Sequence, residues 1–226
     1  MKILLDTADA KAIKEILQFF PIRGITTNPS ILAKEAKDVK VAISKLCDFT
    51  SKDVSLHVQV TAETAEDMLE QAKAIKEVVG DNFYIKIPIT EQGLRAIRLC
   101  KAEGINCTAT AIFTPMQALM AALCGADYVA PYVNRLDNIN SHGGLVIQQI
   151  ADLLDMYNLK TQILAASFKN VEQAYGAAAA GAHAVTITPE LCKELLFHPY
   201  TDKSLQDFAK DWKDKFGKHE IIDLLK

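Results

Sequence analysis

Lys86 is the residue whose placement in this sequence most directly suggests chemistry. It lies in the middle of FYIKIPIT, residues 83–90, an apolar run with the length and the flanking turn signals of a buried strand. Burying an unpaired ammonium is costly, so a lysine there reaches solvent, pairs with a carboxylate such as Asp6, or gives up its proton. Because apolar surroundings lower the pKa of an amine, Lys86 is a candidate nucleophile for carbonyl carbons. The ion pair and the solvent-exposed amine remain alternatives.

A lysine that forms a Schiff base also needs a proton carrier and a positioned water molecule. The side chains that can supply these functions are those of Tyr132, Gln59, Thr110 and Asp6. They are far apart in the sequence, so the fold must bring them to Lys86.

The order of the predicted elements indicates how that happens. Short apolar runs alternate with longer stretches of helical period, and the predicted strands are residues 2–6, 24–28, 56–60, 83–89, 106–113, 128–134, 162–167 and 183–188. Consecutive strand-then-helix units predict an α/β protein with a parallel sheet, and closure into a (β/α)8 TIM barrel leaves no exposed edge. An open, doubly wound sheet is the competing architecture.

Turn and cap residues support these boundaries. Pro29 is placed for the first turn of a helix. Glycines follow four helical stretches where a left-handed residue is expected, at Gly80, Gly104, Gly125 and Gly181.

Polar side chains gather where the predicted strands end. They are Asp6, Thr26, Asn28, Gln59, Lys86, Thr108, Thr110, Tyr132, Asn134, Arg135, Ser167, Thr186 and Thr188. Singly, each has an ordinary explanation, because Asp and Asn cap helices, Thr is common in strands, and Arg is usually solvated. Reactive groups of a closed barrel lie at the carboxyl ends of its strands, so this convergence predicts an active site at that end.

The end of the chain does not belong to this alternation. We predict one barrel domain over residues 1–200 and a helical extension over 201–226. An apolar stripe with three- and four-residue spacing runs along the extension, at Leu205, Phe208, Trp212 and Phe216. The stripe packs either on the helices of its own barrel or on a neighbouring subunit.

Composition narrows the class of protein. The 226 residues are 50% hydrophobic, and the net charge of −3 comes from interspersed charges that give no basic field for nucleic acid. No signal-peptide region or membrane-length apolar run is present, so we expect a cytoplasmic protein without nucleic-acid or membrane partners. The five cysteines form no CxxC pair and the five histidines show no HxxxH spacing, so no metal site is predicted.

Seven segments in order, LLDTAD, GITTNPSIL, HVQV, IKIPIT, GINCTATAIF, APYVNR and ILAASFK, make this sequence similar to the short transaldolase family. It most closely resembles the fructose-6-phosphate aldolase branch, over the whole chain including the C-terminal helix. The resemblance implies a (β/α)8 barrel, a sugar phosphate substrate, and a class I aldolase mechanism without metal or cofactor. It also implies a homo-oligomer, a pentamer or decamer, in which the C-terminal helix is exchanged between subunits.

The resemblance also implies roles for individual residues. Lys86 matches the Schiff-base lysine, and Asp6 matches a carboxylate that helps proton transfers and holds substrate hydroxyls. The residues implied in substrate binding are Thr26, Asn28, Asn134, Arg135 and Ser167, of which the last two match the phosphate-binding pair.

Two positions separate the branches of the family. Transaldolases typically carry Glu on the third strand and Phe in a PFVGR segment, whereas this chain has Gln59 and Tyr132. In the aldolase pattern Tyr132 is the acid/base, and Gln59 and Thr110 hold a water molecule.

The resemblance thus implies reversible cleavage of fructose 6-phosphate to dihydroxyacetone and glyceraldehyde 3-phosphate. One alternative is a transaldolase that moves a dihydroxyacetone unit from sedoheptulose 7-phosphate or fructose 6-phosphate to an aldose phosphate. The other is a phosphosugar-binding barrel without chemistry.

Overall fold

The parallel strands of the protein close on themselves. The structure, a computed structural model, describes residues 1–225. Within that range a closed barrel runs in sequence order through β1 (Lys2–Asp6), β2 (Ile22–Thr26), β3 (Ser55–Gln59), β4 (Phe83–Pro88), β5 (Asn106–Ile112), β6 (Tyr128–Pro131), β7 (Gln162–Ala165) and β8 (Ala184–Ile187). Strand β1 pairs in parallel with both β2 and β8, which closes the sheet. The predicted TIM barrel is confirmed.

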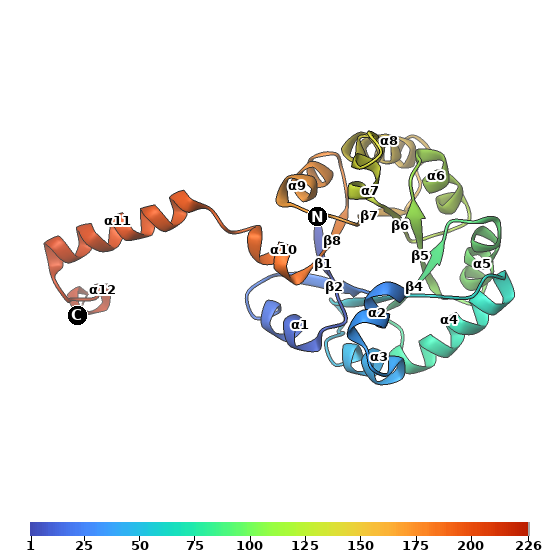
Figure 1. The fold of residues 1–226 in the computed structure, drawn as a ribbon, viewed down its shortest axis with the longest axis horizontal. Coiled ribbons are helices and arrows are strands. Elements are labelled where there is room, and N and C mark those ends of the chain that lie inside the picture. Colours follow the sequence, from blue (N-terminus) through green and yellow to red (C-terminus); the bar gives the residue numbers. More distant parts are fainter. Residues whose placement is uncertain (226) are drawn as a thin grey trace. The chain divides into compact units, whose positions relative to one another are not determined.

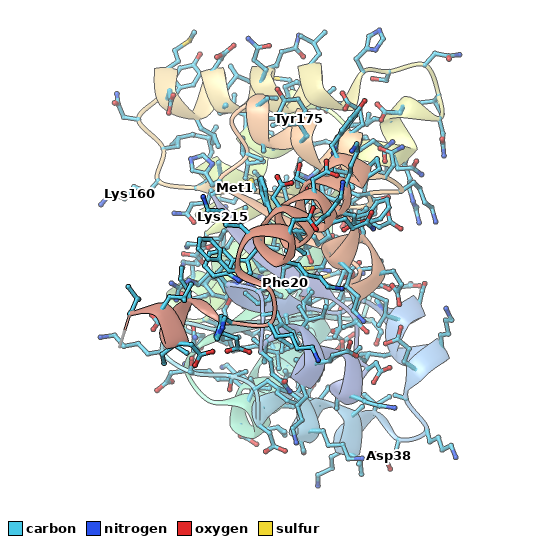
Figure 2. All side chains as sticks on the ribbon, turned by 90° about the vertical axis from the view of Figure 1, so that its left-hand side faces the viewer. Met1, Phe20, Asp38, Lys160, Tyr175 and Lys215 are labelled. Atoms are coloured by element: carbon cyan, nitrogen blue, oxygen red, sulfur yellow. The ribbon has the colours of Figure 1, made fainter. Side chains whose placement is uncertain are left out.

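Helices surround this barrel in a ring (Figure 1). They are α1 (Ala10–Ile16), α2 (Pro29–Glu35), α3 (Val39–Cys47), α4 (Ala65–Val79), α5 (Glu91–Ala102), α6 (Pro115–Leu123), α7 (Val133–Asp137), α8 (Gly143–Met156), α9 (Val171–Ala179) and α10 (Pro189–Glu194). Their inner faces bury apolar residues such as Ile13, Met68, Ile97 and Ile147. Exposed charged side chains lie at the surface between the elements, as Asp38 and Lys160 do in Figure 2.

Local chemistry explains where the helices begin and end. Thr114 and Gln117 form a reciprocal capping box at the start of α6, and Pro29 occupies the first turn of α2. After α4, Gly80 has φ +86°, a conformation that only glycine adopts without strain. The other three predicted glycine caps also have positive φ.

The barrel interior is packed and becomes more polar toward the carboxyl ends of the strands. Near the amino ends lies an apolar layer formed by Leu4, Tyr128, Leu164 and Ala184. The ring of His57, which is fully buried, stacks on Tyr84 at 4.5 Å between centroids. An interior filled in this way leaves reactive side chains accessible only at the carboxyl end.

Three strands end at least two residues earlier than predicted. Strand β2 ends at Thr26, β6 at Pro131 and β7 at Ala165. The sequence beyond each strand still alternates like a strand, but Asn28 caps α2, and Asn134 and Arg135 lie on α7. The predictions for 24–28, 128–134 and 162–167 were therefore wrong at their carboxyl ends, because polar residues of the site follow the strands directly.

A second compact unit begins at Lys193 and contains α11 (Pro199–Phe216) and α12 (Ile221–Leu224). None of the described residues of α11 is buried, and the side chains of Leu205 and Phe208 are 61% and 67% exposed. Within the unit the Trp212 indole packs on Phe216, with centroids 4.6 Å apart, and donates a hydrogen bond to the His219 carbonyl. Across residues 1–225 no helix combines the length and the apolar character needed to cross a membrane.

Candidate active site

A cavity of about 570 Å³ opens at the carboxyl ends of the strands. Seven of the ten residues predicted for the site contribute to its wall: Asp6, Asn28, Gln59, Lys86, Tyr132, Arg135 and Ser167. They come from both halves of the chain, and barrel closure brings them to one opening.

Lys86 extends into this cavity from the centre of β4. Its side chain is only 5% exposed, and its neighbours along the strand, Ile85 and Ile87, are fully buried. Its Nζ donates a hydrogen bond of 2.7 Å to the carbonyl oxygen of Thr27. Burial lowers the pKa of the Lys86 amine below its ordinary value of 10.5, and the nearby Asp6 carboxylate opposes that shift.

Asp6 stands at the end of β1 as the acidic partner of this amine. Its Oδ1 accepts a hydrogen bond of 2.6 Å from Thr26 Oγ1. Burial raises the pKa of the Asp6 carboxyl, while the Lys86 charge and the Thr26 hydrogen bond act to lower it. Lys86 Nζ donates its hydrogen bond to the Thr27 carbonyl and not to Asp6, so Lys86 and Asp6 interact through charge without forming a close ion pair.

Tyr132 and Gln59 provide the groups suited to handling protons and water. The Tyr132 hydroxyl lies 3.1 Å from Thr110 Oγ1, within hydrogen-bond distance. Gln59 is the β3 residue paired in register with Lys86, and its buried Oε1 has no hydrogen-bond partner among the described residues. A buried acceptor without a donor is costly, so this oxygen is suited to hold a water molecule or a substrate hydroxyl.

Arg135 and Ser167 also line the cavity and carry groups that can hold an anion. The Arg135 guanidinium carbon lies 5.3 Å from the centroid of the Tyr132 ring. Ser167 follows β7 with φ +64°, and its carbonyl oxygen accepts a bond of 2.8 Å from the Asn134 backbone N–H. A guanidinium and a hydroxyl that line one cavity match the donors that a phosphate group needs.

Three predicted residues do not belong to the cavity wall. The Thr26 hydroxyl is fully buried and bonds to Asp6, and Thr110 bonds to Tyr132. The Asn134 side-chain oxygen accepts a hydrogen bond from Gln173. These residues contact other residues of the site.

The structure also brings residues to the cavity that the sequence analysis did not identify. Glu35, at the end of α2, accepts hydrogen bonds from Thr7 Oγ1 and from the Ala8 backbone N–H, at 2.9 and 2.7 Å. Ala111 lines the cavity with φ +59°, which nothing in its residue type signals. Glu35 resembles any solvated helix charge in the sequence, although its position seven residues after Asn28 offered a weak signal.

Comparisons with known proteins agree with this geometry. Residues 3–222 match the family model described as Transaldolase/Fructose-6-phosphate aldolase. The chain is 41% identical over 213 residues to "Probable fructose-6-phosphate aldolase" of Streptococcus pneumoniae, covering 94% of this chain and 96% of that one. It is 38% identical over 212 residues to "Probable transaldolase" of Alkaliphilus metalliredigens, covering 94% and 98%.

Among solved structures, the chain is similar to one from Coccidioides immitis whose name describes it as an aldolase. The TM-score is 0.57 at 18% identity, over 99% of this chain and 81% of that one, which indicates a shared fold. The match of the family model and the identity to both relatives over most of their length together show that this chain belongs to the transaldolase/fructose-6-phosphate aldolase family.

Proposed function

We propose that the protein is a class I aldolase that reversibly cleaves fructose 6-phosphate to dihydroxyacetone and glyceraldehyde 3-phosphate through a Schiff base on Lys86. The observation that carries the proposal is the Lys86 amine, which lines the cavity, is almost fully buried and has a lowered pKa. Membership of the family supports a sugar phosphate as the substrate.

The reaction begins with attack of the neutral Lys86 amine on the C2 carbonyl of the ketose phosphate. Loss of water from the resulting carbinolamine gives an iminium ion, which withdraws electrons from C3. Tyr132, directly or through water, removes the proton from the C4 hydroxyl. The C3–C4 bond then breaks, its electron pair forms an enamine with the iminium, and glyceraldehyde 3-phosphate leaves with the new carbonyl at C4.

The enamine that remains must be protonated and hydrolysed. Protonation at C3 restores the iminium, and water adds to its C2 carbon. Gln59, whose buried Oε1 lacks a protein donor among the described residues, is suited to hold that water together with Thr110 and Tyr132. Collapse of the carbinolamine then releases dihydroxyacetone and the free amine of Lys86.

The remaining polar residues suit the two ends of the substrate. Arg135 and Ser167 at the rim are proposed to bind the phosphate. Asp6 and Asn28, which line the cavity with Lys86, are proposed to hold substrate hydroxyls, with Thr26 acting through Asp6. Asn134 is proposed to support the phosphate end by holding the Ser167 backbone.

Transaldolase activity at the same site is the second candidate, because relatives of similar identity carry both names. The deciding experiment supplies fructose 6-phosphate without an acceptor sugar. Release of free dihydroxyacetone supports the aldolase, whereas strict dependence on erythrose 4-phosphate supports the transferase.

The remaining alternative, a barrel that binds sugar phosphates but catalyses no reaction, can be tested by trapping the Schiff base. Borohydride added with substrate should reduce the iminium and leave a covalent adduct on the peptide that contains Lys86. An unmodified peptide in the presence of bound substrate would favour the binding protein.

We also propose that the barrel domain, residues 1–200, works in the cytoplasm as a homo-oligomer formed through residues 201–226. The exposed apolar side chains of α11 support this arrangement, because an apolar stripe of that size is usually covered by a partner. A pentamer or decamer is the assembly expected for the family.

A further inference from the structure

Two buried threonines below the cavity form a short chain of hydroxyl groups that ends on Asp6. Thr26 on β2 is fully buried, and Thr186 on β8 is 3% exposed. The Thr26 Oγ1 lies 2.6 Å from Asp6 Oδ1 and 2.7 Å from Thr186 Oγ1. Because β1 pairs with both β2 and β8, the three side chains are brought together where the barrel closes.

The direction of these hydrogen bonds follows from the groups at the two ends. An ionised carboxylate only accepts hydrogen bonds, and a hydroxyl has a single proton to donate. Thr26 therefore donates its proton to Asp6 and accepts one from Thr186. Hydrogen bonds ordered in this way polarise one another, which strengthens the bond to the carboxylate.

The opposite direction is unfavourable. A protonated Asp6 that donates to Thr26 would make Thr26 donate to Thr186, whose hydroxyl has no second partner among the described residues. A buried donor without an acceptor costs free energy. The chain of hydroxyls therefore favours the ionised form of Asp6.

We propose that Thr186 is a positioning residue for Asp6, which fixes the direction of the Thr26 hydroxyl and so holds the carboxylate ionised and oriented beside Lys86. The role in catalysis rests on the proposed function, in which Asp6 assists proton transfer. The other charged groups around Asp6 are Lys86, which lowers its pKa, and Glu35, which raises it. Lys34 and Arg135 also line the cavity.

The variant Thr186→Val tests the proposal because it keeps the size of the side chain and removes its hydroxyl. We expect the carboxyl pKa of Asp6 to rise, measured by a 13C NMR titration of the side chain assigned with Asp6→Asn. We expect kcat for cleavage to fall about 3- to 10-fold with KM changed less than about 2-fold. Thr186→Ser should restore both quantities.

Thr161→Val is the matched control. Thr161 is also buried, but its hydroxyl donates to the Ala126 carbonyl at 2.7 Å, away from Asp6. This variant should leave the Asp6 titration and kcat unchanged. If Thr186→Val does not fold, Thr186→Ala and Thr186→Ser are compared in the same titration.

An Asp6 titration that is the same in wild type and in a folded variant lacking the Thr186 hydroxyl overturns the proposal. The titration needs no turnover, so it is independent of the proposed reaction. Absence of a borohydride adduct on Lys86 overturns the aldolase function. If the pKa of Asp6 still changes when the Thr186 hydroxyl is removed, the positioning of the Asp6 carboxylate by Thr186 is supported even without that function.

Discussion

Two opposing effects act on the amine of Lys86. Burial inside the barrel favours the neutral amine, and the Asp6 carboxylate favours the ammonium. The Thr27 carbonyl accepts a hydrogen bond from either form. The amine is thus held in place while its proton remains removable, as a nucleophile for carbonyl carbons requires.

The lowered pKa of Lys86 predicts how its reactivity depends on pH. An amine reacts only when neutral, so the midpoint of its reactivity lies at its pKa, below the ordinary value of 10.5. We expect competitive labelling with acetic anhydride, followed peptide by peptide, to give a midpoint below 10.5 for Lys86. The same peptide in denatured protein is the control, and coincident curves would contradict the prediction.

Lys86→Met should abolish cleavage, by about a thousandfold or more, while the protein stays folded. Methionine has a similar length and removes the cost of burying an amine, so the melting temperature should not fall. Cleavage of fructose 6-phosphate and thermal unfolding are the two measurements. Lys101→Met is the control, because Lys101 pairs with Asp127 at 2.9 Å and does not line the cavity. An unfolded Lys86→Met protein would assign Lys86 a structural role.

Gln59→Glu should shift the reaction toward transfer. A carboxylate at this position is attracted to the iminium on Lys86, which prolongs the life of the covalent intermediate and gives an acceptor sugar time to bind. The measurement is the ratio of product transferred to erythrose 4-phosphate over free dihydroxyacetone. Gln71→Glu adds the same charge on α4, where Gln71 caps the Thr61 backbone N–H. An equal ratio in both variants would remove Gln59 as the discriminating residue.

Among single residues, the sequence identified those whose chemistry conflicts with their surroundings. Lys86 in an apolar run and polar groups at strand ends are such conflicts, and seven of the ten predicted side chains line the cavity. Thr26 was assigned to the sugar, yet its hydroxyl is buried against Asp6. The strand on which a residue lies can be predicted from the sequence, but the direction of its hydrogen bond depends on neighbours from other strands.

At the scale of elements, Asn28 shows that one side chain can serve both a helix and a cavity. Its Oδ1 accepts a hydrogen bond of 3.0 Å from the Ile31 N–H and caps α2, and the residue also lines the cavity. Strands were predictable here because each is an apolar run bounded by caps. Helix α7 could not be predicted, because it has only five residues, follows Tyr132 directly and has no side-chain cap at its start.

Variants of Asn28 separate the two roles. Asn28→Asp keeps the cap but adds a negative charge near Asp6, so stability should change by less than about 0.5 kcal/mol while kcat/KM falls about tenfold. Asn28→Ala should lose about 1 kcal/mol of unfolding free energy as well. Urea unfolding and the cleavage assay measure these effects. Asp38→Asn is the control: it makes the opposite substitution at the N-cap of α3 and should leave cleavage unchanged. A fully active Asn28→Asp protein would restrict Asn28 to capping.

For the whole molecule, the proposed assembly predicts that deleting residues 204–226 breaks the oligomer. The deletion removes the exposed Leu205 and Phe208, whose burial in a partner would stabilise the assembly. Light scattering coupled to size-exclusion chromatography should show a smaller number of protomers.

Point variants of α11 test the same interface more finely. Phe208→Ser should weaken the oligomer, whereas Lys210→Ser, which alters a charged position of the same helix, should not. An unchanged number of protomers after the deletion and in Phe208→Ser would contradict an interface formed by this helix.

Closure of the barrel through β1 and β8 also sets the order in which activity returns during refolding. The Thr26–Thr186 contact joins residues 160 positions apart, and bringing such distant segments together carries an entropy cost that local contacts do not. Helices and the strands around Lys86 can form before β8 reaches β1, but the surroundings of Asp6 cannot. During refolding, helical circular dichroism should therefore recover first, and the return of cleavage should report the moment at which the sheet closes.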